Sequence, residues 1–97
     1  MKVYIYCARD KKLGAYQIPE YKTEDKEHIA EGTARSLKVV QVEAIEKARL
    51  RDQALYYMGY FDDLKGKFVL LDEPEKLLDY EDYLPGKDEL HGENGKA

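Results

Sequence analysis

A strand–turn–strand pattern at each end of the chain constrains the fold most. Near the N-terminus three apolar residues alternate with two tyrosines, in the order Val3, Tyr4, Ile5, Tyr6, Cys7. This period of two is typical of a strand that has one covered face. A polar turn over residues 9–14 and a second short run over residues 15–18 follow. We therefore predict an antiparallel hairpin here.

A second hairpin is predicted in the C-terminal half. Over residues 54–61 the alternation places Tyr56, Met58 and Tyr60 on one face, and Leu55, Tyr57 and Phe61 on the other. A turn containing Gly66 leads to a partner strand over residues 68–71, and Pro74 is expected to end the sheet. Residues 75–83 are expected to form one or two helical turns.

Between the two hairpins the pattern is helical. Thr23 is a suitable N-cap, acidic residues follow it, and Ile29 and Leu37 recur at the spacing of one helix face. Residues 38–40 are expected to connect this helix to a second one over residues 41–52. The order ββ-α(α)-ββ predicts an α+β fold, in which an antiparallel sheet of about four strands has helices on one face.

The length of 97 residues allows one small domain. We expect this α+β domain to span residues 1–84 and an acidic tail, residues 85–97, to be disordered. Residues 1–71 hold 13 Lys or Arg against 11 Asp or Glu, whereas residues 72–97 hold 3 against 9. The charge balance thus predicts a mildly basic body and an acidic C-terminal part.

Composition and spacing argue against several classes of protein. The single cysteine, Cys7, excludes an intramolecular disulfide and fits a reducing cytoplasm. No apolar run approaches the ~18 residues of a membrane span, and the first residues lack the pattern of a signal peptide. The two histidines, the single serine and the Asp62-Asp63 pair lack the spacing of a metal or nucleophile site. We expect no enzyme activity, no cofactor and no bound metal.

Tyrosines on the predicted strands suggest a binding surface. If the helices cover one face of the sheet, Tyr4 and Tyr6, opposite Val3, Ile5 and Cys7, stand in solvent. Aromatic rings flanked by cations bind single-stranded nucleic acid, because rings stack on bases and cations attract phosphates. The candidate nucleic-acid-binding residues are Tyr4, Tyr6, Arg9, Lys11, Lys12, Tyr16 and Lys22. Tyrosines are also enriched at protein interfaces, including those of homodimers, and are simply good strand formers.

The acidic C-terminal part offers a second kind of binding surface. Small acidic proteins can present carboxylates in place of phosphates and so occupy the nucleic-acid channel of a basic partner. Such an inhibitor or adaptor, of the anti-defence type, would act on a basic host protein through Asp72, Glu73, Glu75, Asp79, Glu81 and Asp82.

Two segments and an acidic helix start between them carry a resemblance to a known family. The segments are Val3-Tyr4 with Asp10-Lys11-Lys12-Leu13-Gly14-Ala15-Tyr16, and Tyr56-Tyr57-Met58-Gly59-Tyr60-Phe61-Asp62-Asp63-Leu64-Lys65-Gly66-Lys67. Together they resemble the small nonstructural protein of gokushoviruses, which are tailless phages of the Microviridae with circular single-stranded DNA. The resemblance covers residues 2–18 and 55–84.

The resemblance implies a phage nonstructural protein that acts in the host cytoplasm. It implies binding to single-stranded DNA, or to the phage or host replication and packaging machinery, during genome synthesis. No catalytic residues come with it. The matching positions are Asp10, Lys11, Lys12, Gly59, Asp62 and Gly66, of which only the two lysines have an obvious binding role.

Overall fold

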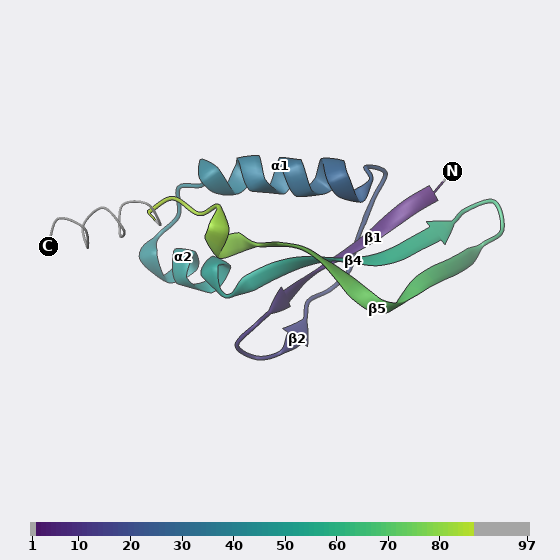
Figure 1. The fold of residues 1–97 in the computed structure, drawn as a ribbon, viewed down its shortest axis with the longest axis horizontal. Coiled ribbons are helices and arrows are strands. Elements are labelled where there is room, and N and C mark those ends of the chain that lie inside the picture. Colours follow the sequence, from purple (N-terminus) through teal and green to yellow (C-terminus); the bar gives the residue numbers. More distant parts are fainter. Residues whose placement is uncertain (1, 87–97) are drawn as a thin grey trace, which may run out of the picture.

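The structure, a computed structural model, describes residues 2–86 and has an α+β fold built on a curled antiparallel sheet (Figure 1). Its elements are β1 (Lys2–Asp10), β2 (Ala15–Tyr16), β3 (Glu20–Lys22), α1 (Lys26–Lys38), α2 (Ala44–Arg51), β4 (Gln53–Asp62), β5 (Lys67–Asp79) and the 3-10 helix η1 (Tyr80–Asp82). The strand order is β2-β1-β4-β5, and β3 also pairs with β1. The predicted fold class and both hairpins are confirmed; most of the expected tail, residues 87–97, lies outside the described residues.

Helix α1 begins two residues later than the sequence predicted. Asp25, not Thr23, is the N-cap, and its Oδ1 accepts a hydrogen bond of 3.0 Å from the backbone N–H of His28. The predicted apolar stripe is confirmed, because Ile29 and Leu37 both pack into the core. Helix α2 is shorter than the predicted 41–52 and contributes a partly buried residue, Leu50, to the same core.

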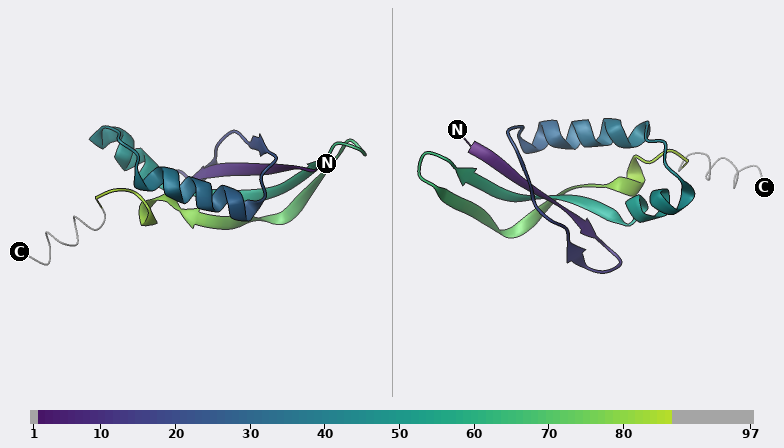
Figure 2. Two further views of the ribbon diagram at one scale, coloured as in Figure 1. Left: turned by 90° about the horizontal axis from the view of Figure 1, so that it is seen from above. Right: turned by 180° about the vertical axis from the view of Figure 1, so that it is seen from behind.

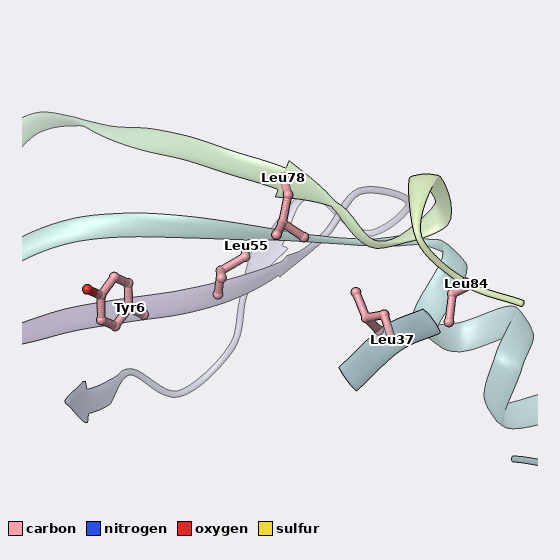
Figure 3. Close-up of a cluster of buried hydrophobic side chains, with 5 residues drawn as sticks. All are labelled: Tyr6, Leu37, Leu55, Leu78 and Leu84. Carbon is pink, nitrogen blue, oxygen red and sulfur yellow. The ribbon is translucent and has the colours of Figure 1, made fainter. Parts of the chain in front are cut away.

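The core is small and lies between α1 and the sheet. It consists of five buried residues from the sheet, from α1 and from the segment after η1: Tyr6, Leu37, Leu55, Leu78 and Leu84 (Figure 3). Tyr4 and Tyr57 pack against this cluster. The helices therefore cover the face of β1 that carries the tyrosines. The expectation that Tyr4 and Tyr6 stand in solvent was wrong, because Tyr6 is part of the core and Tyr4 packs against it.

An irregularity in β4 changes which residues share a face. Tyr6 is opposite Tyr57, but Ile5 is opposite Gly59, so Met58 is an extra residue between them. Such a bulge reverses the alternation beyond it. As a result Tyr60 lies on the face that carries Tyr57, and the predicted division of β4 into two continuous faces was wrong.

Strand β5 does not end at Pro74. It runs from Lys67 to Asp79, and only residues 80–82 are helical, so the predicted end of the sheet and the predicted helical turns over residues 75–79 were wrong. In the pairing with β4, Leu70 is opposite Gly59 and Glu75 is opposite Tyr57. On β4, Met58 is therefore the single residue that lies between these two pairs, whereas β5 has four residues there, 71–74. Because this stretch is a bulge on an edge strand, the missing N–H of Pro74 costs no regular ladder bond.

The molecule is elongated, with principal extents of 59 × 25 × 21 Å. The hairpin of β4 and β5 projects beyond the end of α1, next to the start of β1 (Figures 1 and 2). None of the helices within residues 2–86 is long and apolar enough to cross a bilayer.

Candidate functional site

The sheet face turned away from α1, called the open face below, carries most of the remaining aromatic residues. Cα partners in an antiparallel pair point to the same face, and successive residues alternate. Starting from Tyr6 beneath α1, the register places these residues on the open face: Val3, Ile5, Cys7, Arg9, Tyr16, Tyr21, Tyr56, Phe61, Phe68 and Leu70. Ile5 and Cys7 are buried within the curl of the sheet, whereas Tyr16, Tyr21 and Phe68 are exposed.

Aromatic side chains of the open face form two groups. In the first, the rings of Tyr16 and Tyr56 meet edge to face with centroids 5.4 Å apart. In the second, the rings of Phe61 and Phe68 are 4.9 Å apart, in the projecting hairpin. Such rings offer flat apolar surface to a ligand and hold one another in place.

Arg9 supplies the cation of the first group. Its guanidinium carbon lies 5.4 Å from the centroid of the Tyr16 ring. Within residues 2–86 Arg9 forms no ion pair, and its buried Nε has no hydrogen-bond partner. A guanidinium that stacks on a ring without a carboxylate beside it keeps its charge available to a ligand.

The two N-terminal tyrosines serve the core. The Tyr6 hydroxyl donates a 2.7 Å hydrogen bond to the backbone carbonyl of Glu24. Burial, with Tyr57 nearby, raises the pKa of Tyr6 far above its ordinary value. The Tyr4 ring lies 6.3 Å from that of Tyr57. Tyr6, at 3% exposure, cannot stack on a base.

The lysines proposed for phosphate binding are paired with carboxylates. Nζ of Lys11 lies 3.0 Å from Asp79 and 3.4 Å from Glu81. Desolvation opposes the charged amine, but these two carboxylates outweigh it and raise the pKa of Lys11. Lys12 and Lys22 form longer contacts, of 3.7 Å with Asp52 and 3.4 Å with Glu20. Of the seven predicted residues, the structure brings together Arg9 and Tyr16 on the open face.

Several acidic residues between positions 72 and 82 form ion pairs within the fold. Glu75 pairs with Lys26 of α1 at 2.9 Å, and Asp79 pairs with Lys76 at 2.6 Å as well as with Lys11. The hydrogen bond from Lys76 is the main cause that lowers the pKa of Asp79. Three of the six proposed partner-binding carboxylates, those of Glu75, Asp79 and Glu81, thus hold β5 and η1 to their neighbours.

A groove of about 670 Å³ lies between α1, α2 and the sheet. Its floor is apolar and includes Tyr6, Leu37 and Leu55, whereas its rim mixes both charge signs, as in Glu20 and Arg35. The same residues form the core, so the groove is the open side of a small hydrophobic interior.

Reactive side chains are scarce in the part of the chain that the structure describes. Residues 2–86 contain no group of three His, Cys, Asp or Glu side chains arranged to hold a metal ion. Burial raises the pKa of the Cys7 thiol, which disfavours the reactive thiolate. Comparisons of the chain with models of protein families, with curated proteins and with solved structures give no match.

Sequence reasoning missed Tyr21, Tyr56, Phe61 and Phe68 as members of the open face. The signal that could have found the last two is the Met58-Gly59 pair, because glycine inside a strand often marks a bulge. A bulge there moves Phe61 to the face of Tyr56.

Proposed function

We propose that this chain is a non-enzymatic accessory protein that binds single-stranded DNA weakly through its open face. The observation that carries the proposal is the guanidinium of Arg9, which forms no ion pair within residues 2–86 and lies over the ring of Tyr16, which in turn meets Tyr56. Rings that face solvent can stack on bases, and a cation beside them can contact a phosphate. Such an activity is compatible with the role in phage genome synthesis that the resemblance to gokushovirus proteins implies.

The charges of the molecule support weak binding that depends little on salt. Affinity for phosphates requires free cations, but Lys11, Lys12 and Lys22 are engaged with carboxylates and the formal net charge of the chain is −4. For single strands, a plot of log affinity against log salt concentration has a slope of about −0.7 for each phosphate that the protein neutralises. With Arg9 as the main phosphate contact we expect a slope of about −0.7.

Fluorescence anisotropy with a labelled oligonucleotide of about 30 thymidines, at low and physiological salt, tests the proposal. Tyr16→Ala removes a stacking ring worth about 1–3 kcal/mol per base, so binding should weaken by about fivefold to 150-fold. Its control is Ile45→Ala, which truncates an exposed apolar residue of α2. Arg9→Gln should also weaken binding, whereas Arg51→Gln, which removes a cation of α2 that forms no ion pair within residues 2–86, should not.

Two results would reject this function. The first is no binding by the natural chain at low salt. The second is equal loss of affinity in Arg9→Gln and Arg51→Gln, since that would reduce the interaction to bulk charge.

The acidic inhibitor is not favoured by the structure's charge pairing. A surface that imitates phosphates needs carboxylates that are free to meet a partner's cations. Glu75, Asp79 and Glu81 already have cations within the chain.

A further inference from the structure

We propose that the β5 edge of this protein pairs with the β5 edge of a second copy, in antiparallel register centred on Val69, to form a two-fold symmetric dimer. The inference does not depend on DNA binding.

The first observation is the open edge itself. Within residues 2–86, strand β5 is the last strand in the order β2-β1-β4-β5 and pairs with β4 alone. An edge strand presents unpaired backbone N–H and C=O groups, which are a template for a further strand. Over this stretch β5 lies in the projecting hairpin, beyond the end of α1, and neither α1 nor α2 covers it (Figures 1 and 2).

The second observation is the run of four exposed apolar residues on this edge. Their exposed fractions are 58% for Phe68, 45% for Val69, 61% for Leu70 and 40% for Leu71. Phe68 and Leu70 belong to the open face, whereas Val69 shares the opposite face with Tyr60. Natural edge strands are usually protected by charges or by a covering element. An apolar run on both faces of an edge gains lateral apolar neighbours on each face when another strand adds to the sheet.

The charges on either side of the apolar run favour a second copy of this chain as the partner, in antiparallel orientation. Lys65 and Lys67 precede the run, and Asp72 and Glu73 follow it. None of these four side chains forms an ion pair within residues 2–86. In an antiparallel pair the basic end of each run meets the acidic end of the other, whereas a parallel pair would bring like charges together. The edge is thus complementary to itself.

The symmetry also fixes what the dimer would look like. A two-fold axis perpendicular to the sheet is the operation that joins two identical edges in antiparallel fashion, and it leaves equivalent faces on the same side. Phe68 and Leu70 of one copy would adjoin the same residues of the other. The open faces would become one continuous surface across the dimer.

Sedimentation equilibrium of the full chain over about 1–200 μM tests the proposal. Two charge-reversed variants are needed: Lys65→Glu/Lys67→Glu, which makes both ends of the run acidic, and Asp72→Lys/Glu73→Lys, which makes both ends basic. Each variant alone should dimerise about tenfold or more weakly than the natural chain, because like charges face each other across the strands. An equimolar mixture of the two should recover dimers, because every end then meets an opposite charge.

The mixture makes the test independent of folding and of DNA. A variant that failed to fold could not be rescued by its counterpart, and circular dichroism of each alone provides a direct check. A natural chain that stays an 11.3 kDa monomer throughout this range would overturn the proposal. So would a mixture that associates no better than its components, or open-ended aggregation, since a two-fold contact uses up the β5 edge.

Discussion

Replacement of Gly59 by alanine should be among the most damaging single substitutions in this chain. Gly59 has φ of 134°, a conformation that side-chain-bearing residues rarely adopt. A Cβ built there would overlap the carbonyl oxygen of Val69 and lie 2.8 Å from Cα of Leu70, where ordinary contacts between carbon atoms are about 3.5–4.0 Å. The backbone conformation costs about 1–3 kcal/mol and the forced separation of β4 from β5 a similar amount. We expect Gly59→Ala to lower the free energy of unfolding by about 3 kcal/mol or more.

The chain provides a matched control in Gly66. Its φ is 63° and nothing lies within 4 Å of the position of an added Cβ, so Gly66→Ala carries only the conformational cost of about 1–2 kcal/mol. Urea unfolding followed by circular dichroism measures both variants. If Gly59→Ala were no less stable than Gly66→Ala, the close approach of β5 to Gly59 would be wrong, and with it the bulge that sets the faces of β4.

Three further predictions concern the core and its ionisable groups. Leu55→Ala, at a buried position beside α1, should lower the free energy of unfolding by about 2–5 kcal/mol in urea. Asp79 has a pKa below its ordinary value of 3.8, so its ionised form stabilises the fold above that pH and this contribution is lost as the pH falls through the native pKa. Asp79→Asn should therefore flatten the acid side of a plot of Tm against pH. Cys7 should resist a thiol reagent such as DTNB at pH 8 in the native protein and react when urea unfolds it.

Local patterns in the sequence predicted the fold class because they act over short distances. The alternation over residues 3–7 and the glycine-containing turns specify hairpins without reference to the rest of the chain. The recurrence of Ile29 and Leu37 specifies the buried side of α1 for the same reason. Each of these features depends on neighbours that are close in sequence, and the structure confirms all of them.

The candidate site was harder to predict because it depends on which face the helices cover. Both faces of β1 are largely apolar, so the alternation of Tyr6 with Ile5 and Cys7 does not distinguish them. Which face of β1 is covered depends on tertiary contacts. The hydroxyl of Tyr6 donates a hydrogen bond to the carbonyl of Glu24, and its ring packs with Leu37 and Leu55. A tyrosine can be buried at low cost when its hydroxyl finds such an acceptor. The exposed aromatic surface is consequently on the other face.

The change in charge balance at residue 71 does not coincide with a structural boundary. The balance of charges separates a basic part before this residue from an acidic part after it, but β5 crosses that boundary and continues to Asp79. Two members of the core, Leu78 and Leu84, lie in the acidic part, and so does the carboxylate that pairs with Lys11.

A chain that ends at Leu71 should therefore fail to fold, since it loses the β5 partner of Leu55 and two of the five core side chains. A chain that ends at Gly86 retains all five and should keep the dispersed amide resonances of a folded protein in a proton–nitrogen correlation spectrum. Well-dispersed resonances from the shorter chain would mean that β1, β4 and α1 suffice as a folding unit. In that case residues 72–84 would be an appendage, as their charge alone suggests, and the core described for this molecule would be wrong.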